Sequence, residues 1–152
     1  MRSITRRAVL CALASSLSTI VSIWLNGGPL SPITITRLYT GSDSQTHAES
    51  VEIALTPSTA YSEVGQSEPV KVSEAQFFRL PKGKVQDWHN PARRQYVVTL
   101  TGRGEVEIAG KQKISLSPGR VVLLENVAGR GHITRSFGSE DLTFLMVPLA
   151  AQ

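Results

Sequence analysis

The feature that most constrains the fold is a series of short β-type segments that begins near residue 33 and continues almost to the C-terminus. Most of these segments are separated by residues with turn chemistry, such as Pro81-Lys82-Gly83 and Ser117-Pro118-Gly119. Many short strands at near-regular spacing are typical of a β-sandwich or a β-barrel. No stretch after residue 40 has a convincing helical period. The expected strands are 33–39, 50–55, 75–80, 95–100, 105–108, 113–116, 121–124, 132–137 and 142–147.

Hydropathy along these segments predicts how they are covered. Residues 105–108 and 113–116 alternate strictly between polar and apolar side chains, which predicts a hairpin with one wet face and one buried face. Residues 95–100 are apolar on both sides, which favours a central strand with one face toward a barrel lumen. Polar residues at the start of that strand then lie at the mouth of the lumen. Residues 56–73 are polar, contain two prolines and a glycine, and predict a long surface loop.

The N-terminal segment, residues 1–30, is interpreted as a signal peptide or membrane anchor. A basic start that ends at Arg7 is followed by an apolar, small-residue stretch over residues 8–25 and a helix-breaking Asn-Gly-Gly-Pro sequence. Arg6 and Arg7 resemble the pair of a twin-arginine export signal. We therefore expect a protein that is exported, to the periplasm or beyond, or anchored in a membrane. The alternative is a start placed too far upstream, with a cytoplasmic protein. Residues 31–152 form the folded domain in either case.

The charge distribution argues against nucleic-acid binding. The net charge is +4, but three of the sixteen basic residues lie in the first seven positions. Without that segment the chain is close to neutral, and its basic residues are scattered without an aromatic-basic strip. The single cysteine, Cys11, excludes an intrachain disulfide and a cysteine zinc site.

Two spaced motifs resemble those of the cupins. Gly83, His89, Pro91, Gln95 and Gly102 follow the spacing of the first cupin motif, G-x5-H-x-H-x3-4-E-x6-G. The second motif is matched by the Pro-Gly turn at residues 118–119, the apolar strand after it and a later histidine. The resemblance covers about residues 75–147. It looks closest to small single-domain bacterial cupins with a D-W-H-P-x-P-R-R-Q sequence.

This resemblance implies an all-β fold, a small antiparallel β-barrel or jelly roll over about residues 33–148. Small cupins often pair into homodimers by exchanging or adding edge strands, and residues 33–39 are a candidate for that exchange. The cupin site lies in the barrel lumen, where the resemblance puts a small-molecule ligand.

The resemblance also implies a reduced set of metal ligands. His89 and His132 stand at the first and last histidine positions of the motifs. Pro91 replaces the second histidine and has no ligand atom, while Gln95 replaces the usual glutamate. A divalent Fe, Mn, Ni or Zn ion held by His89, Gln95 and His132 would lack the carboxylate of the common two-His-one-carboxylate triad.

The candidate ligand-binding residues are Trp88, His89, Arg93, Gln95 and His132. Arg93 shares strand parity with Gln95, so its guanidinium is expected to face the lumen, where it suits a carboxylate, a phosphate or an enolate. The alternative for Arg93 is an ion pair with Glu125 or Asp87. Trp88 is either a lid or stacking wall or a core plug. Glu125 is expected to have a structural role.

Three functions are compatible with this sequence. The first is a binding protein, a sensor, or an isomerase- or lyase-like enzyme that holds a small anionic or polar molecule without a complete metal site. The second is a metal-dependent cupin enzyme, such as a dioxygenase or an isomerase. The third is a non-catalytic structural or partner-binding module whose lumen is filled by side chains, among them Trp88, Tyr96, Phe144 and Met146.

Overall fold

The computed structural model describes residues 30–61 and 63–151, which form an almost purely β structure. The signal or anchor predicted for residues 1–30 therefore lies almost wholly outside the described residues. Within the described ranges no helix is long and apolar enough to cross a membrane. The strands are β1 (Ile33–Thr40), β2 (Thr46–Ile53), β3 (Thr56–Pro57), β4 (Gly65–Gln66), β5 (Gln76–Leu80), β6 (Val85–His89), β7 (Gln95–Thr101), β8 (Arg103–Glu107), β9 (Lys113–Leu116), β10 (Val121–Glu125), β11 (His132–Phe137) and β12 (Leu142–Pro148), with one short 3-10 turn, η1 (Ala109–Lys111).

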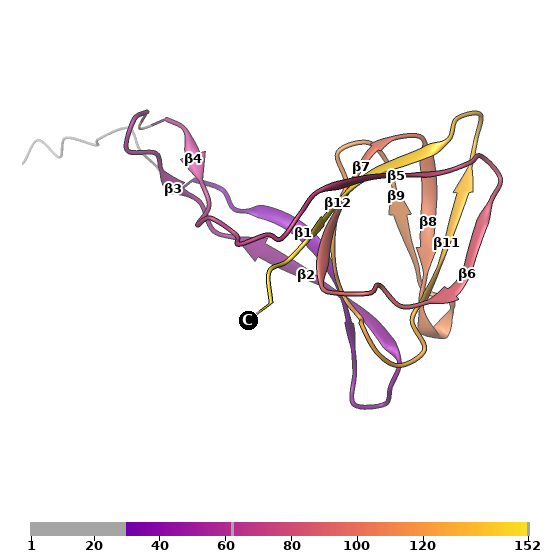
Figure 1. Cartoon of the computed structure of the whole chain (residues 1–152). Helices are drawn as coiled ribbons and strands as arrows, with labels where there is room; N and C mark the ends of the chain where they lie inside the picture. The colour runs from indigo at the N-terminus through magenta and orange to yellow at the C-terminus, as the bar shows by residue number, and fades with distance from the viewer. Residues whose placement is uncertain (1–29, 62, 152) are drawn as a thin grey trace, which may run out of the picture.

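Two sheets face each other and form the barrel (Figure 1). One has six strands in the order β2-β1-β10-β7-β12-β5, and the other has four in the order β6-β11-β8-β9. The predicted all-β barrel is confirmed. The antiparallel prediction holds for every pair of these two sheets except β1 and β10, which run parallel. These two strands are far apart in sequence, so no tight turn imposes an antiparallel arrangement on them.

β1 does not form the edge of its sheet. It pairs with β2 on one side and with β10 on the other, so both of its hydrogen-bonding edges are used within the chain. Strand addition at residues 33–39 is therefore not open in this chain, while strand exchange of these residues between two copies stays a prediction. The edges of the six-stranded sheet are β2 and β5. Those of the four-stranded sheet are β6 and β9, and a homodimer built by strand addition would use one of these four edges.

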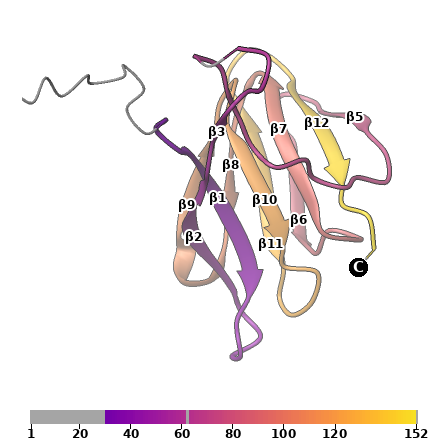
Figure 2. The same cartoon turned by 90° about the vertical axis from the view of Figure 1, so that its left-hand side faces the viewer.

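The expected loop over residues 56–73 contains a short ladder of its own. β3 pairs with β4, with Thr56 opposite Gln66 and Pro57 opposite Gly65. The ladder lies away from the barrel, beyond one end of β1 and β2 (Figure 1), while Figure 2 shows β1 beside β10 in the six-stranded sheet. The loop prediction is thus right for most of the segment and misses two strands of two residues each.

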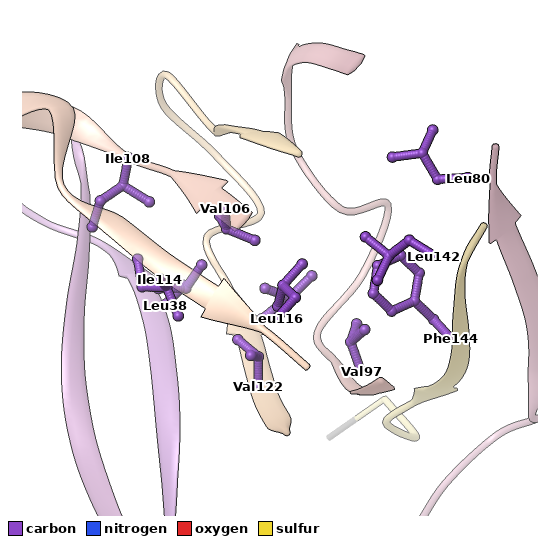
Figure 3. Close-up of a cluster of buried hydrophobic side chains, with 11 residues drawn as sticks. Leu38, Leu80, Val97, Val106, Ile108, Ile114, Leu116, Val122, Leu142 and Phe144 are labelled. Atoms are coloured by element: carbon purple, nitrogen blue, oxygen red, sulfur yellow. The ribbon is translucent and has the colours of Figure 1, made fainter. Parts of the chain in front are cut away.

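The hydrophobic core lies between the two sheets and is built by the inward face of each (Figure 3). β7 shows the pattern: Gln95, Val97 and Thr99 are buried, while Tyr96 and Val98 on its other face are half-buried. β7 is a central strand, as predicted, but its outer face is covered only in part. The core side chains are Leu38, Leu80, Val97, Val106, Ile108, Ile114, Leu116, Val122, Leu124, Leu142 and Phe144.

Candidate functional site

A cavity of about 280 Å³ opens between the sheets, at the end where β10 and β12 end and β7 and β11 begin. Its floor is apolar and shared with the core, through residues such as Val97, Leu124 and Phe144. Its polar lining is Glu74, Gln76, Gln86, His89, Asn90, Arg93, Gln95, His132 and Thr134. The volume is close to the lower end, about 300 Å³, of typical ligand pockets, so it suits a small molecule.

His89 and His132 lie side by side in this cavity, as the two motifs predicted. They are opposite residues on β6 and β11, and their ring centroids are 4.4 Å apart. Between this pair and the next, Thr134 with Gln86, β6 has one more residue than β11. This extra residue is a β-bulge, and it breaks the alternation of β6 so that both Gln86 and His89 reach the cavity.

Each imidazole is held through its Nδ1 atom. Nδ1 of His89 lies 2.7 Å from the carbonyl oxygen of Asp87, which can only accept, so this nitrogen carries a proton. Nδ1 of His132 lies 2.8 Å from the side-chain nitrogen of Asn126, which donates to it. Among the described residues, neither Nε2 atom has a hydrogen-bond partner. Neither is one of the fully buried polar atoms that lack a partner. Both Nε2 atoms therefore open onto the cavity.

His132 is kept neutral by its surroundings. The residue is only 2% exposed. Burial, with a smaller contribution from the neighbouring His89, lowers the pKa of His132 to about 3 from an ordinary value of 6.5. At neutral pH the cavity therefore presents an uncharged imidazole at this position.

Gln95 and Arg93 both line the cavity, as predicted, but Arg93 lies in a bend before β7, so strand parity does not place it there. Gln95 is only 6% exposed, and its side-chain amide has no hydrogen-bond partner among the described residues. Because the amide is not among the fully buried polar atoms without a partner, it faces the cavity. Arg93 lies at the mouth and pairs with Glu74 at 3.3 Å. The alternative partners predicted for Arg93, Glu125 and Asp87, are therefore wrong. Both members of the Arg93–Glu74 pair are about half exposed, so a competing anion can displace the carboxylate.

Trp88 is not part of the cavity wall. It is half-buried, and the guanidinium of Arg130 lies 4.1 Å from its ring centroid in a cation–π contact. Of the side chains expected to fill the lumen, Phe144 and Met146 line the cavity, whereas Trp88 and Tyr96 do not.

Glu125 ties the start of β7 to β10 and β1 on the outer face of the six-stranded sheet. Its carboxylate accepts hydrogen bonds from Arg94, including one of 2.7 Å from Nε, and from Nε of Arg37 at 2.5 Å. Burial alone would raise the pKa of the Glu125 carboxyl, but the hydrogen bonds from Arg94 and Arg37 outweigh it and hold the pKa below its usual range. The expected structural role fits this geometry, which fixes the backbone beside Arg93 and Gln95.

Replacing Glu125 by Gln is expected to lower the free energy of unfolding by about 1–3 kcal/mol, because two guanidinium groups lose their shared anion. Urea unfolding at pH 7 measures this loss. Glu49 is the matched control, since it pairs with Arg37 at a more exposed position, and Glu49→Gln is expected to cost at most about 0.5 kcal/mol. Equal losses in the two variants would contradict the structural role of Glu125.

The sequence interpretation missed Asn126, which is 0% exposed and contacts His132. A signal for it exists: Asn126 has the same parity as Val122 and Leu124, whose side chains face inward from β10. Gln86 has no such signal, because the bulge in β6 changes the parity of that strand.

The candidate metal ligands do not make a fitting metal site. Within residues 30–61 and 63–151, no three His, Cys, Asp or Glu side chains group so as to hold an ion. The cavity supplies two imidazoles and a neutral amide, and the Nδ1 lone pair of His132 already accepts a hydrogen bond from Asn126. Glu74, the acidic residue in the described lining of the cavity, pairs with Arg93 at the mouth and is not part of this set, so these three side chains bring no carboxylate to stabilise a divalent cation.

Comparison with known proteins gives structural neighbours only. No family model and no curated protein matches the chain. Similar solved structures include a cupin 2 conserved barrel domain protein from Rhodopseudomonas palustris, with 18% identity over 80% of this chain and 73% of that one at a TM-score of 0.44. A cupin protein from Bacteroides fragilis has 25% identity, coverages of 54% and 69%, and a TM-score of 0.39.

A conserved protein of unknown function from Streptococcus pyogenes is also similar, with 19% identity and a TM-score of 0.42. The match covers 51% of this chain and 64% of the streptococcal protein, which is less than two thirds of its length. The assignment to the D-W-H-P-x-P-R-R-Q group stays a prediction from the sequence motifs.

Proposed function

We propose that the chain binds a small organic molecule in the barrel cavity without a tightly held metal ion. The observation that carries this proposal is the amide of Gln95, which is almost buried, bonds to no described residue and faces the cavity. An amide that faces a cavity and has no protein partner is available to hydrogen-bond a ligand, or water in its place. The apolar floor and the single guanidinium at the mouth then favour a ligand with an apolar body and an anionic end.

Two alternative functions have less support. A filled lumen was expected of a structural module, and the cavity of about 280 Å³ argues against it. A metal-dependent enzyme needs a ligand set that His89, Gln95 and His132 do not complete. Elemental analysis of the full chain, purified without chelator, tests this alternative. A near-stoichiometric transition metal that is lost in a His89→Ala, His132→Ala double variant would overturn the metal-free proposal.

Ligand binding is tested by thermal and urea unfolding in the presence of a panel of small hydroxy-, keto- and aromatic carboxylates. A ligand at 100 times its Kd is expected to raise the free energy of unfolding by about 2.7 kcal/mol. Gln95→Leu, which keeps the approximate shape and removes the amide, is expected to abolish this gain while the variant stays folded. Gln112→Leu, at an exposed position outside the cavity, is the control, and this variant is expected to keep the ligand-induced gain in stability. A gain that survives Gln95→Leu would contradict the assigned site.

A further inference from the structure

The orientation of the Asn126 side chain is decided by its neighbours. The hydroxyl of Thr46 donates to the carbonyl oxygen of Gly131 at 2.7 Å, so its oxygen is left as an acceptor. The Asn126 amide nitrogen donates to that oxygen at 3.3 Å and to Nδ1 of His132 at 2.8 Å. Turning the amide over would put two acceptor oxygens against each other. It would also place the NH₂ group where Oδ1 now lies without any partner.

This orientation sets the position of the proton on His132. Because Nδ1 accepts from Asn126, the neutral ring carries its proton on Nε2. The opposite holds for His89, whose Nδ1 donates to the carbonyl of Asp87 and whose Nε2 keeps a lone pair. Two neighbouring imidazoles thus open onto one cavity as a donor and an acceptor.

We propose that Asn126 fixes His132 as the Nε2–H tautomer, so that the His89–His132 pair recognises a hydroxyl group of an organic ligand rather than a metal ion. The proposal rests on the proposed function and names the chemical group that the cavity takes. A hydroxyl oxygen accepts from Nε2–H of His132, and its hydrogen is donated to Nε2 of His89. A metal ion needs a lone pair from each imidazole, and His132 has none on the cavity side.

The tautomers are measured directly by long-range 15N–1H NMR correlation of the histidine rings in the full chain at pH 7, without any ligand. The expected result is Nε2–H for His132 and Nδ1–H for His89. Nδ1–H on His132 would overturn the proposal. Since no ligand is present, a negative ligand screen leaves this measurement unaffected, and the failures of the two proposals are distinguishable.

Asn126→Asp is expected to reverse the selection. A carboxylate only accepts hydrogen bonds, so it favours the tautomer of His132 in which Nδ1 carries the proton and donates to it. The Nε2 atom then has a lone pair facing the cavity. Co²⁺ alone, followed by its visible absorption and by calorimetry, is expected to bind about 10- to 100-fold more tightly than to the wild type. Adding His132→Ala to the variant is expected to remove this gain. A folded Asn126→Asp protein that binds Co²⁺ no better than the wild type would overturn the proposal.

A second pair of variants keeps the proposal falsifiable if Asn126→Asp does not fold. Thr46→Val removes the acceptor that orients the amide, so a fraction of His132 is expected to change to the Nδ1–H tautomer. Thr36→Val is the matched control, because Thr36 in β1 is buried, as Thr46 in β2 is, but bonds to Arg120 instead of Asn126. A His132 tautomer that is unchanged by Thr46→Val would show that Asn126 does not depend on Thr46, and would overturn the argument.

Discussion

Between pH 7 and pH 5 the free energy of unfolding is expected to fall by about 2 kcal/mol, because His132 stays neutral in the fold and becomes protonated when the chain unfolds. The folded pKa of His132 is lowered to about 3 from an ordinary value of 6.5. Its contribution is therefore complete above pH 6.5 and is lost as the pH falls, by up to about 1.4 kcal/mol per pH unit until the folded pKa is reached. The sign follows from the unfolded state, which binds more protons in this window.

Urea unfolding at pH 7, 6 and 5 measures this slope. Asp43 and Glu125 are the carboxyls with lowered pKa, and their ordinary values are 3.8 and 4.5. The stability that they contribute is therefore lost mainly below pH 5. His132→Asn is the control, because its amide oxygen can accept from Asn126 in place of Nδ1 and it cannot be protonated. The variant is expected to lose most of the slope. Equal slopes in wild type and variant would contradict the buried, neutral state of His132.

The strands with regular alternation and clear turns were predictable from the sequence. Residues 113–116 form a strand with the expected bounds, since their polar and apolar positions match the two faces of a half-buried sheet. Residues 132–137 also have the expected bounds, although His132, Thr134 and Ser136 are polar and buried. β6 was missed because its bulge removes the period of two from Val85–His89. The long pairing between β1 and β10 has no local signal, because it depends on tertiary contacts between distant segments.

The site was predictable where a motif position and strand parity agree. His89, Gln95 and His132 line one cavity, and Arg93 joins them from a bend before β7 rather than from the strand. Trp88 was included only for its neighbourhood in the sequence, and the structure places it under Arg130 instead. The partner of Arg93 could not be deduced, because Glu74 precedes β5 in a segment without periodicity. Ligand binding by these residues stays a prediction.

Gly131→Ala is expected to lower the free energy of unfolding by about 2–5 kcal/mol, the sum of a left-handed backbone penalty and an overpacking cost. Gly131 has a φ of +76°, and a Cβ atom there would lie 2.1 Å from the carbonyl oxygen of His89. This close approach is what lets β11 begin with His132 directly opposite His89. The substitution should therefore disturb the histidine pair as well as the fold.

Gly83→Ala is the matched control for this clash. Gly83 has nearly the same φ, +72°, but nothing lies within 4 Å of a Cβ atom built on it. Its loss is expected to be the backbone penalty alone, about 1–2 kcal/mol. Urea unfolding gives both losses, and the 15N shifts of His89 and His132 are expected to move in Gly131→Ala and to stay in Gly83→Ala. If the two variants lose equal stability and leave the histidine shifts unchanged, the contact between Gly131 and His89 does not position the pair.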